Sequence, residues 1–225
     1  MLKKICEHTF LADKLGKDSV VVNLGANKGE FTNAVRGVFK CKIYAIEPVP
    51  ELFASLKDGD GVVKIQGAIT AKDEMMTLFI PEDRCATLHL LAPVPAKTIE
   101  VQGYTLRRFL SVNGIDTIDL LKVDIEGAEL DLFDGFSSDD LRKISQCTVE
   151  FHDFLYEELH ERVEAAKEKI VSAGFYCIPF SLNNGDVLFV RKDVISFSRY
   201  FFLRYFWKYV RGFFRKAKRM IFGVR

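Results

Sequence analysis

Two glycines, four positions apart, follow a run of β-branched residues near the start of the chain. Val20–Leu24 predicts a buried strand, Gly25 and Gly29 predict a tight turn, and the amphipathic stretch from Glu30 predicts a helix. Glycine lets the backbone turn sharply and approach a ligand closely, because it has no Cβ. The helix start adds unpaired N–H groups and the positive end of the helix dipole. This pattern predicts a site for a nucleotide-like cofactor.

The composition of the turn narrows the choice of cofactor. It reads G-A-N-K-G, and it matches neither G-x-G-x-x-G nor G-x-x-x-x-G-K-[ST], the two patterns that cradle phosphates. Glu47 ends the next predicted strand, where a carboxylate can accept hydrogen bonds from both ribose hydroxyls. S-adenosylmethionine, which has a ribose but no phosphate, therefore fits better than NAD. The residues that we expect to bind it are Asn23, Gly25, Asn27, Gly29, Thr32, Glu47, Gln66 and Asp124.

Ionisable residues follow two later predicted strands. Asp124 and Glu126 lie at the end of one strand, and Glu150 and His152 lie at the end of the next. Since the carboxyl ends of parallel strands meet at one edge of a sheet, we expect these four catalytic candidates to face the cofactor. We expect His152 to act as the general base for an acceptor hydroxyl, with Asp124 or Glu150 orienting it.

A divalent cation is the alternative to a histidine base. Asp124, Glu150 and His152 could hold Mg²⁺ or Mn²⁺, which would lower the pKa of the acceptor hydroxyl. Carboxylates with one imidazole suit these ions only moderately, so metal-free chemistry is favoured.

Alternating strands and helices position these residues, which predicts an α/β three-layer sandwich with a mostly parallel sheet. The expected strands are 20–24, 42–46, 62–69, 118–125 and 146–151, followed by a closing hairpin of 176–180 and 187–190. Met75–Ile80 is expected to pair antiparallel with residues 62–69, and residues 81–98 to form an irregular loop. Residues 1–18 are expected to form a short amphipathic helix.

The chain resembles the FkbM family of S-adenosylmethionine-dependent methyltransferases over about residues 18–190. The resemblance is carried by V-N-L-G-A-N-K-G-E-F-T, A-I-E-P, I-D-L-L-K-V-D-I-E-G-A-E and V-E-F-H. It implies the class I methyltransferase (Rossmann-like) fold with a seven-stranded sheet, and O-methylation of sugars or other hydroxylated molecules. Family members usually carry Asp where this chain has Asn23, which implies a weaker hold on the cationic end of the cofactor. We therefore expect Asn23→Asp to tighten cofactor binding.

Charge divides the 225-residue chain into a domain of residues 1–195 and a tail of residues 196–225. The tail holds nine of the 32 basic residues and none of the 31 acidic ones, which leaves an acidic body. Residues 199–221 place basic side chains on one helical face and apolar ones opposite, which favours an anionic membrane surface. The alternatives are a helix docked on the domain or on a dimer partner, and a nucleic-acid contact, although we expect no nucleic-acid partner.

Five scattered cysteines without a C-x-x-C pair, and a charged N-terminus, favour a cytoplasmic protein, which the tail could hold at the inner face of the membrane. We predict an S-adenosylmethionine-dependent O-methyltransferase acting on a hydroxyl of a sugar, a glycan or a related acceptor, with lipid-linked acceptors included. The alternative is a non-catalytic S-adenosylmethionine-binding or scaffold module on the same fold, tethered by its tail.

Overall fold

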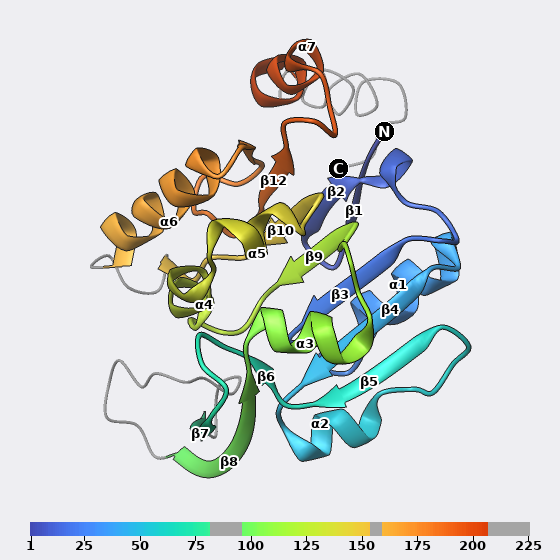
Figure 1. Ribbon diagram of the computed structural model, residues 1–225, viewed down its shortest axis with the longest axis vertical. Helices are drawn as coiled ribbons and strands as arrows, with labels where there is room; N and C mark the ends of the chain where they lie inside the picture. Colours follow the sequence, from blue (N-terminus) through green and yellow to red (C-terminus); the bar gives the residue numbers. More distant parts are fainter. Residues whose placement is uncertain (82–95, 154–158, 207–225) are drawn as a thin grey trace, which may run out of the picture.

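A seven-stranded sheet forms the centre of the molecule (Figure 1). The computed structural model describes residues 1–81, 96–153 and 159–206. The strand order in the central sheet is β11-β12-β10-β9-β3-β4-β5, in which only β12 runs antiparallel to its two neighbours. These strands are β3 (Val20–Leu24), β4 (Lys42–Glu47), β5 (Val62–Gln66), β9 (Leu120–Val123), β10 (Gln146–Val149), β11 (Phe175–Pro179) and β12 (Val187–Arg191). The predicted α/β three-layer sandwich with a mostly parallel seven-stranded sheet is thus confirmed.

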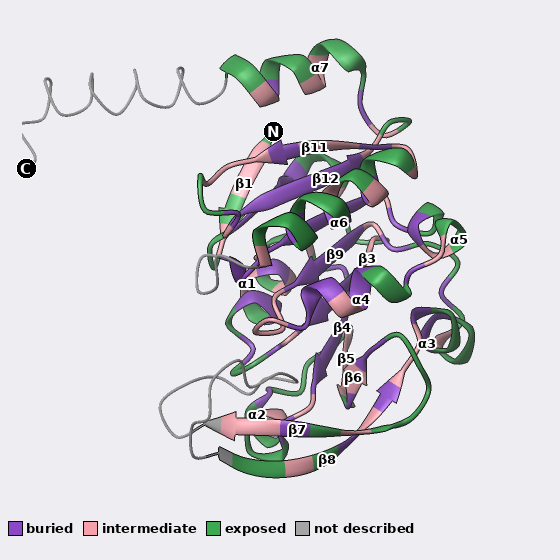
Figure 2. Ribbon diagram, turned by 90° about the vertical axis from the view of Figure 1, so that its left-hand side faces the viewer, coloured by how far each residue is buried: buried purple, intermediate pink, exposed green. Residues whose placement is uncertain are grey.

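Helices cover both faces of the sheet, and the central strands are buried between them (Figure 2). One face packs against α3 (Leu106–Asn113), α4 (Glu129–Gly135), α5 (Ser138–Arg142) and α6 (His160–Ser172). The other face packs against α1 (Glu30–Phe39), with α2 (Pro50–Ser55) beside it. Burial of both faces explains why Leu120–Val123 carries no alternating pattern, since parallel strands in such sandwiches have no solvent side.

The N-terminal residues form a hairpin instead of the expected helix. β1 (Leu2–Ile5) pairs antiparallel with β2 (His8–Leu11), and the two turn residues, Cys6 and Glu7, both have positive φ. η1 (Ala12–Lys14) follows as one turn of 3₁₀ helix. The helix prediction was wrong because this two-residue turn lacks the Gly or Asn that usually marks a hairpin in sequence.

The hairpin is held by side chains that lie far away in the sequence. The backbone N–H and the hydroxyl of Thr9 donate to the two carboxylate oxygens of Asp186, at 3.0 and 2.7 Å. The backbone N–H of Leu11 donates to the side chain of Gln146, at 2.9 Å. β2 therefore lies against β10 and β12, on the face of the sheet that α1 also covers.

A three-stranded sheet lies beside the end of β5. It has the order β6-β8-β7, with β6 (Ala68–Ile69), β7 (Met75–Pro81) and β8 (Ala96–Tyr104). The strand expected at Met75–Ile80 is thus present, but its antiparallel partner is β8 rather than residues 62–69. The start of β8 also falls inside the loop expected at 81–98, of which residues 82–95 lie outside the described part.

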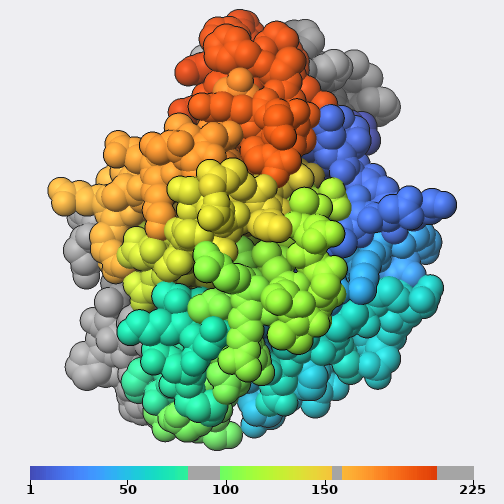
Figure 3. All heavy atoms as spheres, in the orientation of Figure 1, coloured from blue at the N-terminus to red at the C-terminus, as the bar shows by residue number. Residues whose placement is uncertain are grey.

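The tail begins as a helix. α7 (Phe197–Phe201) continues into one turn of π-helix, η4 (Phe202–Phe206), at one end of the molecule beside the N-terminus (Figure 3). The predicted helix of residues 199–221 can be followed only to Phe206, since residues 207–225 lie outside the described part. Among the described helices none combines the length and the apolar character needed to cross a bilayer.

Candidate active site

The glycine turn joins β3 to α1 at the carboxyl edge of the sheet. The backbone N–H groups of Gly25 and Ala26 both donate to the carbonyl of Ile46 on the neighbouring strand, at 3.2 and 3.0 Å. Gly25 has a φ of 74°, and Gly29, which precedes the first residue of α1, has a φ of 81°. Both values lie in the left-handed region that glycine adopts without steric cost. The strand, turn and helix predicted here are confirmed.

Glu47 lies at the end of β4 and faces this turn. One carboxylate oxygen accepts the backbone N–H of Asn27 at 2.7 Å, and the other accepts that of Val49 at 3.0 Å. Burial raises the pKa of Glu47 from its ordinary value, although both hydrogen bonds favour the ionised form. Each oxygen retains a second lone pair, so the carboxylate is held in place with two acceptor positions for the hydroxyls of a ribose.

Two cavities meet at the turn. A mostly apolar one lies on the Glu47 side, and a more polar one lies on the side of the N-terminal hairpin. Gly25, Asn27 and Asp124 line both. The apolar cavity includes Ile46, Glu47, Val49, Leu52, Ile69 and Leu78, and the polar one includes Cys6, His8, Lys28, Glu30 and Lys122. A ligand with an aromatic ring at one end and charges at the other matches this pair of cavities.

Four of the expected cofactor residues line neither cavity: Gly29, which belongs to the turn itself, and Asn23, Thr32 and Gln66. Asn23 is fully buried, and its side-chain amide donates to the hydroxyl of Thr32 at 3.0 Å. Neither Asn23 nor Thr32 lines either cavity. Both side chains therefore stabilise the turn from within the fold. Asn23 does not face the position where the cationic end of a cofactor would lie. Gln66 is exposed, and the next residues, Gly67 and Ala68, line the apolar cavity in its place. The expected contact of Gln66 with adenine is therefore not supported by the geometry.

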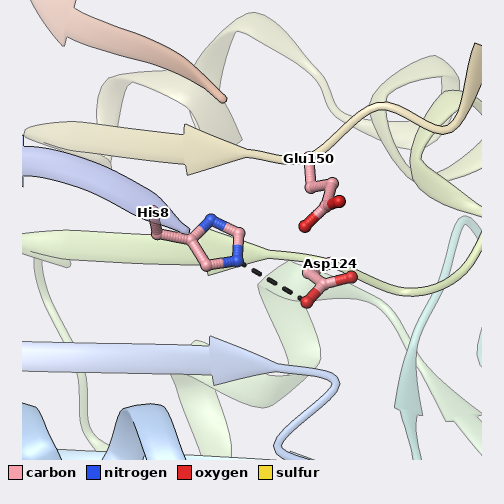
Figure 4. Close-up of side chains that lie close together, drawn as sticks. All are labelled: His8, Asp124 and Glu150. Carbon is pink, nitrogen blue, oxygen red and sulfur yellow. Dashed lines mark ion pairs between the residues drawn. The ribbon is translucent and has the colours of Figure 1, made fainter. Parts of the chain in front are cut away.

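Asp124 follows β9 and lies between two basic side chains from different elements. Its Oδ2 is 3.1 Å from Nζ of Lys122 and 3.5 Å from Nε2 of His8, which reaches it from β2 (Figure 4). Burial favours the protonated acid, but His8 and Lys122 outweigh it and hold the pKa of Asp124 well below its usual range. The carboxylate is therefore ionised at neutral pH.

His152 is held by Glu129, the first residue of α4. Its Nδ1 is 3.0 Å from Oε1 of Glu129, an oxygen that also accepts the backbone N–H groups of Ile125 and Gly127. Its Nε2 lies 3.4 Å from Glu126 and 3.9 Å from Asp124. The residue that orients His152 is thus Glu129, and not Asp124 or Glu150 as expected from the sequence.

These contacts determine the charge of His152. Burial alone would lower its pKa, but the hydrogen bond to Glu129 and the charges of Glu129, Glu126 and Asp124 raise the pKa to about 9. An imidazole that already holds a proton at neutral pH cannot accept another. This electrostatic environment disfavours the expected role of His152 as the general base.

The pKa of Glu150 leads to a different role from that of His152. It is half-buried at the end of β10, and burial together with the negative charges of Asp124 and Glu126 raises its pKa to about 7. A carboxyl group with this pKa changes between its neutral and ionised forms near neutral pH. That is the property required of a general base.

The sequence missed two residues of this site and the role of a third. His8 lies on an element that was expected to be a helix, so nothing placed it near Asp124. Lys122 carried a detectable signal, because it is a charged residue within an apolar central strand. Glu129 lies in the first turn of α4, where an acidic residue usually serves the helix end, yet its side chain is buried and orients His152.

Two groups of three described side chains have the spacing of metal ligands, and Asp124 belongs to both. One adds His8 and Glu150 (Figure 4), and the other adds Glu126 and His152. The expected set of Asp124, Glu150 and His152 is not one of them. A divalent ion in either group would lie near the buried ammonium of Lys122, which already pairs with Asp124. Repulsion between two cations in a site of low dielectric disfavours such an ion.

Comparison with known proteins places this geometry among methyltransferases. The model of the methyltransferase FkbM domain matches residues 23–175. A curated protein, Methyltransferase 1 of Beauveria bassiana (strain ARSEF 2860), is 30% identical over 163 residues, which are 60% of this chain and 66% of that protein, just under two-thirds of its length.

Solved structures show similar folds at low identity. Methyltransferase FkbM from Methylobacillus flagellatus KT has a TM-score of 0.47 and 16% identity, covering 78% of this chain and 44% of that one. The fibrillarin pre-rRNA processing protein of Methanococcus jannaschii has a TM-score of 0.48 and 15% identity, covering 84% of this chain and 69% of that one.

Proposed function

The chain belongs to the FkbM family of S-adenosylmethionine-dependent methyltransferases, and we propose that it methylates a hydroxyl group of a sugar or glycan. The observation that carries the proposal is the common edge of the sheet. There Glu47 and the glycine turn line a cavity together with Asp124 and Glu126, and Glu150 and His152 lie close to Asp124. This edge therefore offers groups for the cofactor and, beside them, groups for proton transfer.

The residues at the turn fit S-adenosylmethionine. A Cβ on Gly25 would lie 1.9 Å from the carbonyl oxygen of Asp124, so backbone packs against backbone beside both cavities. Glu47 would accept the ribose hydroxyls, the apolar cavity would take the adenine, and the charged side chains of the polar cavity would face the amino-acid end. When bound, the cofactor supplies the methyl group as an electrophile on its sulfonium.

Glu150 is the residue that we assign as general base. Its carboxylate would accept the proton of the acceptor hydroxyl, because its pKa of about 7 leaves a large ionised fraction at neutral pH. His152, protonated and held by Glu129, would keep Glu126 and Asp124 in place as acceptors for other hydroxyls of the substrate. Several carboxylates at one edge suit a polyhydroxylated acceptor, whereas they would repel the phosphates of a nucleic acid.

The start of the tail supports association with a membrane surface. Five aromatic side chains of α7 and η4 are 44–65% exposed: Phe197, Phe201, Phe202, Tyr205 and Phe206. The segment is fixed to the domain, since Leu203 is buried and Arg199 donates to both carboxylate oxygens of Asp13, at 2.7 and 2.8 Å. Exposed rings next to Arg199 and Arg204 match the interface of an anionic bilayer. We propose peripheral binding that brings the site to amphiphilic acceptors.

Binding and turnover test the enzymatic proposal. Isothermal titration of the full chain with S-adenosylhomocysteine should give a 1:1 complex, and NAD should give none. Methyl transfer from labelled S-adenosylmethionine to a panel of oligosaccharides should then be lost in Glu150→Gln. Binding without transfer to any hydroxylated acceptor would instead support the scaffold alternative, and no binding would contradict both.

Liposome sedimentation tests the membrane proposal. The full chain should sediment with phosphatidylserine vesicles and not with neutral ones. The triple variant Phe201→Ser, Phe202→Ser, Phe206→Ser should sediment less, because it removes exposed apolar area from α7 and η4. Val112→Ser on α3, which removes a side chain that is 76% exposed elsewhere, is the matched control. Equal sedimentation of the triple variant and the control would contradict membrane binding through this segment.

A further inference from the structure

Lys122 is a buried lysine in the middle of the central sheet. It lies on β9 between Leu121 and Val123, and only 3% of the residue is exposed. Taking an ammonium group out of water is costly unless each of its N–H groups finds a partner. The acceptors around the Lys122 ammonium therefore indicate why a charged side chain is found at this buried position.

Three acceptors surround the ammonium of Lys122. Nζ lies 2.8 Å from the carbonyl oxygen of Gly25, 3.2 Å from that of Leu24 and 3.1 Å from Oδ2 of Asp124. An ammonium has three donors and no acceptor, so these contacts use its full capacity. Lys122 is thus neither a proton acceptor nor a free donor for a ligand.

The three acceptors belong to two parts of the site. Leu24 and Gly25 form the start of the glycine turn, and Asp124 lies at the end of the adjacent strand, among the ionisable side chains. Their backbones already touch at Gly25, where no Cβ fits. Lys122 adds the electrostatic connection, because one charge satisfies the turn carbonyls and the carboxylate together.

We propose that Lys122 is a positioning residue that holds the glycine turn in register with Asp124, so that the cofactor meets a preformed site. The inference rests on the proposed function, since it concerns the same cofactor. The other ionisable groups that face Asp124 are His8 from β2, Glu126 from its own loop, and Glu150 and His152 after β10. His8 also contacts Asp124, but burial lowers the pKa of its imidazole and disfavours its charged form.

The test compares Lys122→Met with Lys169→Met in the full chain. Lys169 also donates to two backbone carbonyls, those of Phe133 and Asp134, but it lies on α6 and lines neither cavity. Lys122→Met should weaken the binding of S-adenosylhomocysteine by about 10- to 100-fold, as expected for loss of one partner from a buried charged hydrogen bond. Lys169→Met should leave the affinity unchanged, even if it lowers the melting temperature.

The pH dependence separates positioning from a merely structural role. Without Lys122 the pKa of Asp124 should rise, so the residual binding of Lys122→Met should fall more steeply on acidification than that of the wild type, in which Glu47 also titrates. Asp124→Asn introduced into Lys122→Met should remove this additional acid dependence, because it removes the group whose pKa has changed. If Lys122→Met does not fold, Lys122→Gln, which keeps an amide donor without the charge, should show the same acid dependence.

Wild-type affinity in Lys122→Met or Lys122→Gln at all pH values would overturn the inference. So would an equal loss in Lys169→Met, since the effect would then be general destabilisation. These outcomes are distinguishable from failure of the proposed function, in which the wild type itself would not bind S-adenosylhomocysteine.

Discussion

The carbonyl oxygen of Asp124 occupies the position that a side chain on Gly25 would need. A Cβ built on Gly25 would lie 1.9 Å from this oxygen, and the residue has a φ of 74°. Two strands that are adjacent in the sheet therefore meet backbone to backbone beside both cavities. This one contact fixes the position of the glycine turn relative to Asp124 and the ionisable side chains around it.

Gly25→Ala should be strongly destabilising because of this contact. The new methyl group must displace the Asp124 backbone and also adopt a left-handed conformation, at a combined cost of more than about 3 kcal/mol in the free energy of unfolding. Gly37→Ala in α1 is the control, since nothing lies within 4 Å of its Cβ position, and it should gain about 0.5–1 kcal/mol. Urea unfolding measures both. A Gly25→Ala protein as stable as the wild type would show that the two backbones are further apart.

Glu47→Gln should weaken cofactor binding, and it should also lower stability, because one of the backbone N–H groups of Asn27 and Val49 loses its acceptor. The amide keeps one carbonyl acceptor but loses the charge and one acceptor oxygen, so hydrogen bonds to ribose hydroxyls are lost or weakened. We expect a loss of about 10- to 100-fold in affinity for S-adenosylhomocysteine by isothermal titration. Glu51→Gln, a nearby exposed residue on α2, should bind as the wild type does. Equal affinities in both variants would contradict the assignment of Glu47 to the ribose.

The rate of methyl transfer should rise with pH around neutrality. The pKa of Glu150 is raised to about 7, so the ionised base predominates only above that pH. Glu150→Gln should lower kcat by about 10²- to 10⁴-fold and remove the dependence near pH 7. Glu161→Gln, at the exposed start of α6, should keep the wild-type profile. A profile that persists in Glu150→Gln would assign proton transfer to another group.

Folding stability should depend on His152 in the alkaline range. Its folded-state pKa of about 9 lies above the ordinary value of 6.5, so the folded protein binds this proton more tightly than the unfolded chain does. The stabilisation is complete below about pH 6.5 and is lost as the pH rises through about 9, with a magnitude on the order of 2 kcal/mol. Urea unfolding from neutral to alkaline pH should therefore show a decline that His152→Gln lacks. His160→Gln, on the surface of α6, is the control and should decline as the wild type does. The same decline in His152→Gln would mean that other groups cause it.

Asn23→Asp should not tighten cofactor binding, although the family resemblance implies that it would. The side chain at this position is fully buried against Thr32 and lines neither cavity. An aspartate would bury a carboxyl group with one hydroxyl partner, and it should lower stability without tightening cofactor binding. A tighter complex in titration, with unchanged stability, would restore the original interpretation of Asn23.

The sequence by itself determined the elements whose signals are local. The glycine turn, the carboxylate of Glu47 at the end of a strand, and Asp124 at the end of an apolar strand all follow from residues within a few positions of one another. Parallel strands collect their carboxyl ends at one edge, so the local patterns also predicted which of these residues meet.

Only the tertiary structure decided which side chains control the charges of the site. His8 reaches Asp124 from a hairpin that was expected to be a helix, and Lys122 finds its acceptors 97 and 98 residues away, on β3 and the turn that follows it. Protonation was decided in the same way, because burial and neighbouring carboxylates raise the pKa of His152 to about 9 and that of Glu150 to about 7. These pKa values depend on the distances between residues that are remote in sequence and on the exclusion of water around them. The spacing of residues along the chain contains neither kind of information.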